Sequence, residues 1–316
     1  MPTKVLIALG GNALSPSDTL GTIAEQFAHT RQALGMVMPF IRRGDLVAIA
    51  HGNGPQVGDE LRRGELAAEN IPPLPLGLCV AATQGTIGYM IEQSLQNALL
   101  DEDIHRDVVS FITQVIVDEN DPALAEPTKF IGHRYTEARA QELAGRYGWT
   151  VAEQEPGAWR RVVPSPRPIR INNAKSIRGL VEAGSVVIAA GGGGIPAYIM
   201  QNGHFEGLDA VIDKDLAAAV LGQEIGAQHL YILTAVPEVY LDFDTPRQKP
   251  LRHATIAEAR TYLAAGQFPA GTMGPKIEAA IQFIDGGGER VVITGIDTLD
   301  AALEGAAGTV IEAGEA

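Results

Sequence analysis

The stretch KVLIALGGNALS (residues 4–15) begins as a buried strand and ends in almost bare backbone. Its apolar run VLIAL (5–9) has no polar interruption, which is typical of a strand covered on both faces of a parallel sheet. The run stops at Gly10, Gly11 and Asn12. Because glycine lets backbone N–H groups approach an anion closely, this stretch predicts a central strand whose tip contacts a ligand.

Similar apolar runs recur along the chain, and helical patterns separate them. In residues 22–43 and 84–100, apolar side chains recur on one face at the spacing of an α-helix. Such alternation predicts an α/β fold, a three-layer α/β/α sandwich with a mostly parallel central sheet, in a single domain of residues 1–316. The expected strands are 5–9, 46–50, 108–117, 185–190, 229–235 and 289–295, and the further helices are 136–147, 174–183, 214–222, 255–265 and 275–285.

Residues 118–170 depart from this alternation. Two proline-containing stretches, DENDPALAEPTKFIGHRY (118–135) and EPGAWRRVVPSPRPIRI (155–171), lie on either side of a short helical pattern. Prolines in such number interrupt regular elements. We therefore expect residues 118–170 to form an insertion that protrudes from the sheet as a small lid, within the same domain.

Composition and charge exclude several classes of partner. The 316 residues carry a net charge of −14, which repels nucleic acid and anionic lipid, so neither is expected as a partner. No apolar run approaches the roughly 20 residues of a membrane span, and the N-terminal run is too short for a secretory signal. Cys79 is the only cysteine, which excludes an intrachain disulfide and fits a reducing compartment. The expected location is the cytoplasm.

Four expected strands end in turns of small residues. In open parallel sheets, ligands bind beyond the carboxyl ends of the strands, so four such turns would form one polar rim. Taken singly, each turn is explained as well by the tight strand-to-helix connection that glycine permits. The turns are GGNA (10–13), HGNGPQVG (51–58), GGGGIPA (191–197) and TAVPEVY (234–240). The candidate phosphate- and substrate-binding residues are Gly10, Gly11, Asn12, Gly52, Asn53, Gly54, Gly191 and Gly192.

Two common nucleotide motifs fit poorly. The turn at 192–197 matches G-x-G-x-x-A, but Pro196 and further turn residues follow where a long helix should begin. This mismatch disfavours a nicotinamide or flavin site. No Gly-Lys pair occurs anywhere in the chain, so a Walker A loop is absent.

Three lysines occupy positions that suit phosphate. Lys214 begins a predicted helix and lies between Asp213 and Asp215. Lys276 begins another helix, and Lys129 lies in the predicted lid. Phosphoryl transfer needs positive charge around the transferring group, and lysines at helix starts supply it. Taken singly, each lysine is explained more readily as a surface charge or a local ion pair.

The remaining candidates have two interpretations each. Asp215 either fixes Lys214 or helps to hold Mg²⁺ through water. Arg160 and Arg161 are either anion contacts at the base of the lid or a surface pair on an extended segment. The histidines show no metal-like spacing, so no metal ligand is assigned directly.

Eight short motifs occur together in one order and are far more specific than any glycine turn alone. They are ALGGNAL (8–14), HGNGPQVG (51–58), QGTIGYM (84–90), PTKFIG (127–132), WRRVVPSP (159–166), IAAGGGGIP (188–196), GLDAVIDKDLAAAVL (207–221) and GTMGPKIEAA (271–280). With these motifs the chain resembles the carbamate kinases of the amino acid kinase family over nearly its full length.

The resemblance implies phosphoryl transfer from ATP to carbamate, giving carbamoyl phosphate and ADP, or the reverse reaction, with Mg²⁺. It also implies a homodimer, and a place in arginine metabolism or in purine and ureide breakdown. Gly10, Gly11, Asn12, Gly52 and Asn53 would cradle carbamate and the transferring phosphoryl group. Lys214 and Lys276 would neutralise phosphate with Asp215 organising them, and Lys129 would reach in from the lid, supported by Arg160 or Arg161. Ala235, Tyr240, Met273 and Gly274 would lie on the nucleotide side.

The sequence departs from the family pattern at a few positions. Phe130 follows the lid lysine where a proline is common, and Arg134 adds charge beyond it. Ala235 replaces an aspartate found in many relatives, and Asn172 and Asn173 replace an apolar and acidic stretch. Two other hypotheses therefore stay open: a kinase of the same family with another small acceptor, and a non-catalytic sensor of nucleotide or carbamoyl phosphate.

Overall fold

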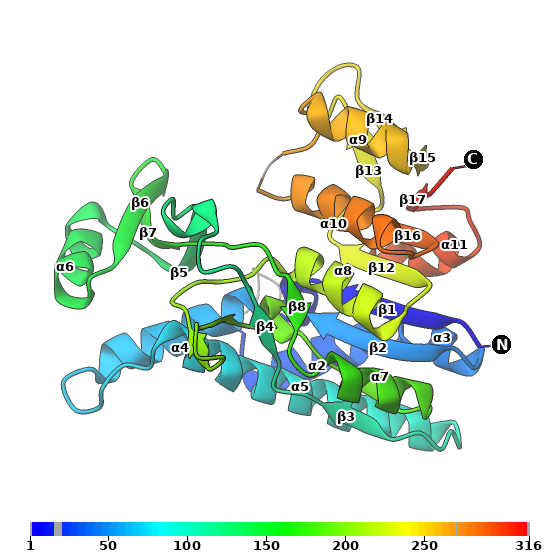
Figure 1. The fold of residues 1–316 in the computed structure, drawn as a ribbon, viewed down its shortest axis with the longest axis horizontal. Coiled ribbons are helices and arrows are strands. Elements are labelled where there is room, and N and C mark those ends of the chain that lie inside the picture. The colour runs from blue at the N-terminus through cyan, green and yellow to red at the C-terminus, as the bar shows by residue number, and fades with distance from the viewer. Residues whose placement is uncertain (1, 16–20, 270, 315–316) are drawn as a thin grey trace.

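The computed structural model describes residues 2–15, 21–269 and 271–314, apart from the side chains of Asn12 and Ala13. Its centre is an eight-stranded sheet with the order β15-β17-β16-β12-β1-β2-β9-β3 (Figure 1). All neighbouring strands are parallel except β16 and β17. The predicted mostly parallel sheet is confirmed. Its strands are β1 (Lys4–Leu9), β2 (Leu46–His51), β3 (Val108–Ser110), β9 (Val186–Ile188), β12 (His229–Thr234), β15 (His253–Thr255), β16 (Arg290–Gly295) and β17 (Thr309–Glu312).

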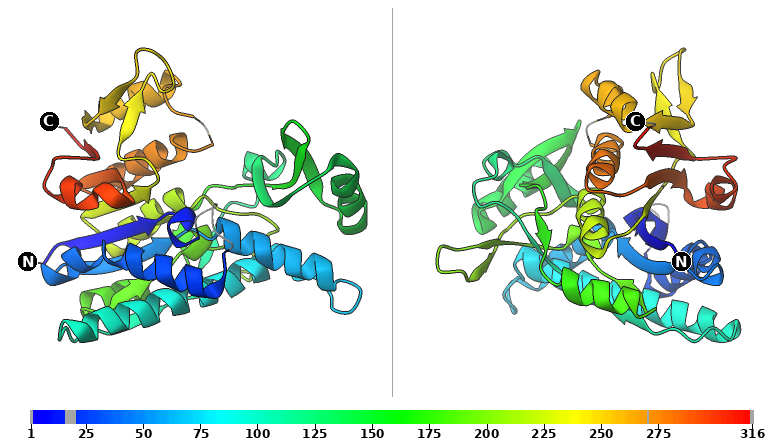
Figure 2. Two further views of the ribbon diagram at one scale, coloured as in Figure 1. Left: turned by 180° about the vertical axis from the view of Figure 1, so that it is seen from behind. Right: turned by 45° about the vertical axis from the view of Figure 1, so that its right-hand side comes forward.

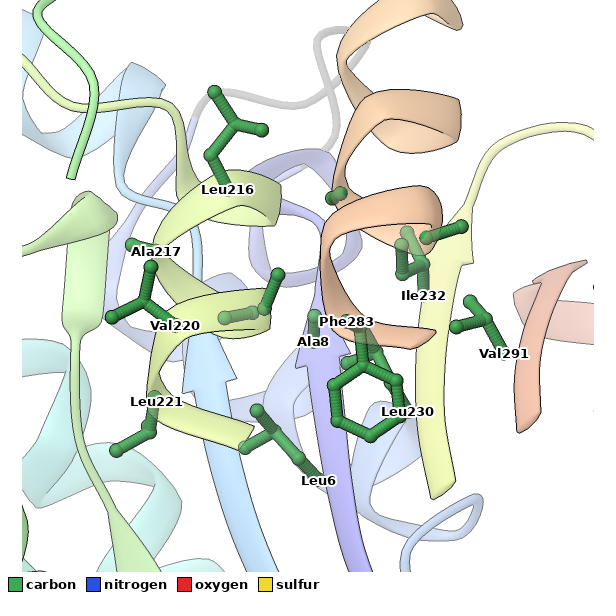
Figure 3. Packing of buried hydrophobic residues seen from close by; sticks show 14 of the residues in the cluster. Leu6, Ala8, Leu216, Ala217, Val220, Leu221, Leu230, Ile232, Phe283 and Val291 are labelled. Atoms are coloured by element: carbon green, nitrogen blue, oxygen red, sulfur yellow. The ribbon is translucent and has the colours of Figure 1, made fainter. Parts of the chain in front are cut away.

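Helices cover both faces of this sheet, which confirms the predicted three layers (Figure 2). Alternate residues of β1 enter the two cores, because successive strand side chains point to opposite faces. Leu6 and Ala8 pack against α8 and α10, as Figure 3 shows, whereas Ile7 packs on the α5 face. The first face carries α7 (Ala174–Glu182), α8 (Lys214–Ile225), α9 (Ile256–Ala264) and α10 (Gly274–Asp285). The second carries α2 (Ile23–Leu34), α3 (Met38–Arg42), α5 (Leu76–Asp101) and α11 (Leu299–Leu303).

Short elements and small sheets surround the central sheet. One sheet has the order β11-β10-β4-β8, another joins β13 to β14, and a third has the order β5-β7-β6. Their strands are β4 (Gln114–Ile116), β5 (Lys129–Tyr135), β6 (Thr150–Glu155), β7 (Ala158–Val163), β8 (Arg170–Ile171), β10 (Ile195–Ile199), β11 (Phe205–Gly207), β13 (Val239–Leu241) and β14 (Lys249–Leu251). The remaining helices are α1 (Gly11–Leu14), α4 (Gly54–Ala67), α6 (Glu137–Tyr147), η1 (Pro122–Leu124), η2 (Gly191–Gly193) and η3 (Ile296–Thr298).

The segment that contains β5, α6, β6 and β7 stands away from the central sheet (Figures 1 and 2). Its sheet is antiparallel, with Phe130 opposite Val162 and Val151 opposite Arg161. The chain enters and leaves this segment through β4 and β8, which pair with each other. We call residues 129–163 the protruding segment.

Two sequence predictions were wrong in detail. Residues 108–117 form two short strands in different sheets and not one long strand. The chain breaks between them because the Thr113 amide donates to the Gln84 side chain at 2.6 Å and not to a neighbouring strand. Residues 22–43 form two helices, α2 and α3, because the chain turns at Gly35 and restarts with Pro39 in the first turn of α3. In the described part of the chain, no helix has the length and apolar character needed to cross a membrane.

Candidate active site

A cavity of about 660 Å³ opens where the carboxyl ends of β1, β2 and β12 meet the first turns of α4, α8 and α10. The start of β5 on the protruding segment forms a further wall. The structure therefore brings most of the predicted site residues to one edge of the sheet. Those that line the cavity are Gly10, Gly11, Gly52, Asn53, Gly54, Gly192, Lys129, Lys214, Asp215, Lys276, Ala235, Tyr240 and Met273.

Other predicted residues lie outside the cavity lining. Gly191 faces the His51 ring, and a Cβ atom on it would lie 2.4 Å from Nε2 of that histidine. Gly274 packs against the Pro269 carbonyl oxygen, 3.2 Å from an added Cβ atom. The side chain of Asn12 lies outside the described part of the structure.

Arg160 and Arg161 also lie outside the cavity, within the protruding segment. The Arg161 guanidinium lies 4.8 Å from the centre of the Trp149 ring and forms an ion pair with Asp209. Burial lowers the pKa of Arg161. Arg160 donates to the Gln154 side chain at 3.0 Å. In this arrangement Arg161 connects the protruding segment to the chain leading into α8.

Two lysines and one carboxylate form the charged centre of the cavity. Asp215 is 3% exposed; its Oδ2 accepts from Lys276 Nζ at 2.7 Å, and its Oδ1 accepts from Lys214 Nζ. Burial would raise the pKa of Asp215, but the two ammonium groups outweigh it and bring that pKa to about 2. Burial lowers the pKa of Lys214, against the attraction of Asp215. Two cations and one anion leave net positive charge at this point.

Asp213 fixes the beginning of α8. As the N-cap residue, it accepts from the Asp215 amide through Oδ1 at 2.9 Å, which satisfies a donor that the helix leaves free. Its Oδ2 accepts from Lys129 Nζ at 3.0 Å, so it also joins α8 to β5. Sequence reasoning treated Asp213 only as a neighbour of Lys214. Its place directly before a helix start was the available signal.

The glycine turns touch one another. A Cβ atom at Gly52 would lie 2.7 Å from the Gly11 backbone nitrogen. Gly192 has a φ of +64°, and a Cβ atom there would lie 2.2 Å from Nδ2 of Asn53. These glycines are therefore needed for close approach between turns, and not only for the turns themselves. The packing exposes backbone around the charged centre.

Apolar and aromatic side chains complete the lining. On the side of β12, β13 and α10 it includes Tyr240 and Phe243, whose rings lie 6.5 Å apart, and Thr272 and Met273. On the side of α4 and β5 it includes Pro55, Val57, Phe130, Ile131 and Val211. Phe243 and Pro269 were not among the sequence candidates, since nothing in their spacing sets them apart. Thr272 was missed although it lies in the motif GTMGPKIEAA, directly before the candidate Met273.

Among the residues that the structure describes, metal ligands of the usual kind are not grouped in this cavity. Within the described residues, no cluster of three or more His, Cys, Asp or Glu side chains is arranged to hold a metal ion. Asp215 is engaged by two lysines, and Asp213 by Lys129 and a backbone amide.

Comparison with known proteins gives a consistent picture. The sequence pattern of the Amino acid kinase family matches residues 3–295. A carbamate kinase from Pyrococcus horikoshii is 45% identical over 313 residues, which is 98% of this chain and 99% of the relative. A crystal structure of a protein from Aeropyrum pernix K1 has a TM-score of 0.93 at 38% identity, covering 98% of this chain and 99% of that one. The carbamate kinase from Giardia lamblia bound to AMP-PNP has a TM-score of 0.90 at 36% identity, covering 98% of both chains.

Proposed function

The chain belongs to the amino acid kinase family, and we propose that it transfers the γ-phosphoryl group of ATP to carbamate, giving carbamoyl phosphate and ADP. The observation that carries this proposal is the Lys214–Asp215–Lys276 group at the tips of β1 and β2, within a cavity large enough for a nucleotide. A pair of lysines beside exposed glycine backbone suits a group that is anionic throughout the reaction.

The chemistry needs no protein nucleophile. A carbamate oxygen attacks the γ-phosphorus in line, the bond from phosphorus to the β,γ-bridging oxygen breaks, and ADP leaves with that electron pair. Lys214 and Lys276 neutralise the negative charge on the phosphoryl oxygens, and Asp215 keeps both ammonium groups in place. Positioning and charge neutralisation are the whole contribution of the protein.

The reactants are assigned to opposite ends of the cavity. We place the nucleotide beside Tyr240 and Met273, because a purine ring packs well on aromatic and thioether groups. Carbamate lies near Gly11 and Asn53, since an amide and exposed backbone N–H groups suit a small carboxylate.

We propose that residues 118–170 act as a lid and that Lys129 is its catalytic residue. Lys129 pairs with Asp213 here, and its side chain is 39% exposed. An anionic phosphate in the cavity competes with Asp213 for this ammonium group. Outside the cavity, Arg161 supports the lid through its contacts with Trp149 and Asp209. Arg160 lies on the same strand, one residue farther from the central sheet.

ATP is expected to enter together with Mg²⁺, which neutralises phosphate charge. The carboxylates of the cavity already have partners, so the phosphate oxygens and water would supply the ligands. Asp213 is the protein group that could approach through water once Lys129 moves to the phosphate.

The same site serves both directions, because one phosphoryl group moves between the same two oxygens. We propose that the reaction is reversible and able to run toward ATP from carbamoyl phosphate, as arginine or purine breakdown would require. Since the substrates are ATP and ADP and Cys79 is unpaired and buried, we propose the cytoplasm as the location.

We further propose a homodimer formed through α5. Leu78, Tyr89 and Leu100 recur at intervals of 11 residues, which is close to three helical turns, so they lie on one stripe. They are 54%, 59% and 63% exposed. Such an apolar stripe is typical of an interface. Analytical ultracentrifugation that compares the oligomeric state of the wild type with that of a Tyr89→Glu variant tests this proposal. A wild-type protein that is monomeric at micromolar concentration would refute it.

The activity is tested with carbamoyl phosphate and ADP, because carbamate decomposes in water. Formation of ATP in a coupled assay, together with ADP release from ATP and carbamate, is the expected result. The same ADP-release assay with N-acetylglutamate, UMP and isopentenyl phosphate should give no signal. Turnover with one of these and none with carbamate would identify another acceptor. ATP binding without any turnover would identify a sensor.

A further inference from the structure

Two side chains of α5 lie behind the cavity and contribute to none of the steps above. Gln84 begins the motif QGTIGYM (84–90) and Thr83 directly precedes it; the two residues are 2% and 1% exposed. Neither side chain lines the cavity. Each forms hydrogen bonds to a segment that does line it.

Gln84 holds the glycine turn after β9. Its Nε2 donates to the Gly191 carbonyl oxygen at 3.0 Å and to that of Thr113 at 3.2 Å, and its Oε1 accepts from the Thr113 amide at 2.6 Å. The Thr113 hydroxyl in turn accepts from the Ala190 amide at 3.0 Å. Gln84 and Thr113 therefore hold the two residues that precede Gly192.

This turn needs external support. Ala190 has a φ of +52°, the left-handed conformation that costs a residue with a Cβ atom about 1–2 kcal/mol. Gly192, Gly193 and Gly194 also have positive φ values. A backbone with such φ values keeps a single conformation only when surrounding groups hold it in place.

Thr83 sets the orientation of Asn53. Its hydroxyl donates to the Val80 carbonyl oxygen at 2.8 Å, so it offers only lone pairs to Asn53. Nδ2 of Asn53 donates to this hydroxyl at 2.8 Å. The hydroxyl therefore decides which end of the carboxamide faces α5 and which faces the cavity. Gly192 packs directly against the same amide, since a Cβ atom on it would lie 2.2 Å from Nδ2 of Asn53.

We propose that Thr83 and Gln84 are positioning residues that fix the Asn53 carboxamide and the 190–194 turn, and thereby set how well the acceptor is held. The term acceptor rests on the proposed function. The arrangement is one unit, because successive residues of a single helix support two turns that come from different strands. Neither residue touches the nucleotide end of the cavity.

The test for Thr83 compares Thr83→Val with Thr83→Ser. The first removes the hydroxyl at nearly constant shape, and the second keeps it. We expect Thr83→Val to lower kcat/KM for carbamoyl phosphate about tenfold, the effect of one neutral hydrogen bond, with KM for ADP unchanged. Thr83→Ser, which keeps the hydroxyl, should retain most of the wild-type kcat/KM for carbamoyl phosphate. A wild-type kcat/KM for carbamoyl phosphate in Thr83→Val, or a change in KM for ADP as large as the change for carbamoyl phosphate, would overturn the proposal.

A second readout does not depend on turnover. With ¹⁵N-labelled asparagine, the side-chain NH₂ signals of Asn53 can be assigned by their loss in Asn53→Asp. We expect these signals to shift in Thr83→Val and to stay close to wild type in Thr83→Ser. Unchanged signals in Thr83→Val would refute the positioning role. Absence of carbamate kinase activity in the wild type would instead refute the proposed function and leave this result standing.

Gln84→Glu tests the support of the 190–194 turn by Gln84. It also provides an independent test of the proposal if Thr83→Val does not fold. A carboxylate at this position cannot donate to the carbonyl oxygens of Gly191 and Thr113, whereas its protonated form regains one donor. We therefore expect the activity of Gln84→Glu, divided by that of wild type, to rise severalfold as pH falls from 8 to 6. A ratio that is flat with pH would contradict the proposal.

Discussion

The cavity draws its positive charge from two regions that are built in opposite ways. Lys214 and Lys276 belong to helices packed on the central sheet, and both pair with the buried Asp215. Lys129 belongs to the protruding segment, is more exposed, and pairs with Asp213. A buried carboxylate with two cations holds its geometry with or without a ligand, whereas a single exposed pair is easily exchanged.

This difference indicates a division of work. We propose that the helix lysines define the place of the phosphoryl group and that the lid lysine joins only when substrate is present. The following experiments test that division, and the first is expected to have the largest effect.

Replacing Lys214 by alanine should lower kcat by about 10²–10³-fold, because it removes a charge that stabilises the transition state directly. The matched control is Lys175→Ala, which removes an exposed lysine near the start of another helix. Steady-state kinetics with carbamoyl phosphate and ADP measure the effect, and circular dichroism verifies folding. A folded Lys214→Ala protein with wild-type kcat would exclude Lys214 from the mechanism.

Asp215→Asn should cost about 10²-fold in kcat, somewhat less than loss of a lysine, since it misplaces both ammonium groups without removing them. It also removes the charge that opposes the effect of burial on Lys214, so the pKa of Lys214 falls further. The alkaline limb of the pH–rate profile should therefore move to lower pH. Asp285→Asn, which breaks an exposed ion pair with Arg260, is the control. An alkaline limb unchanged from wild type would argue against the coupling.

Lys129→Ala should have a smaller effect, about tenfold in kcat/KM, because it removes one charged hydrogen-bond donor while the helix lysines remain in place. Asp213→Asn retains a good N-cap but removes the charge that holds Lys129, and we expect it to change kcat/KM by about threefold or less. Kinetics of both variants and of the double variant measure this. A loss for Lys129→Ala as large as that for Lys214→Ala would remove the distinction between the two regions.

At neutral pH the smallest effect is expected for His51, which lies under the glycine turns. Burial lowers its pKa from 6.5 to about 4. The unfolded chain therefore takes up a proton near pH 6.5 that the folded chain refuses until about pH 4. Stability should fall across this window as pH drops, by roughly 3 kcal/mol in total.

Chemical denaturation of His51→Asn at several pH values tests this, with His105→Asn as the control for an exposed histidine. The free energy of unfolding of His51→Asn should depend less on pH between 6.5 and 4 than that of wild type. Equal slopes would mean that the folded chain protonates His51 at the same pH as the unfolded chain does.

The sequence was sufficient where local chemistry determines the structure. Apolar runs ending in glycine predicted β1 and β2 with the rim at their tips, and a lysine at a helix start predicted the place of Lys214. The sequence was insufficient where contacts between residues far apart in the chain determine the structure. The break between β3 and β4 depends on Gln84, and the position of Arg161 depends on Trp149 and Asp209. No pattern of neighbouring residues contains those contacts.

The most direct test of the account is a crystal structure with the non-hydrolysable nucleotide AMP-PNP and Mg²⁺. The account predicts γ-phosphate oxygens within about 3 Å of Nζ of Lys214 and Lys276, with the adenine beside Tyr240. A γ-phosphate that contacts neither lysine and points to solvent, with the nucleotide fully occupied, would contradict it.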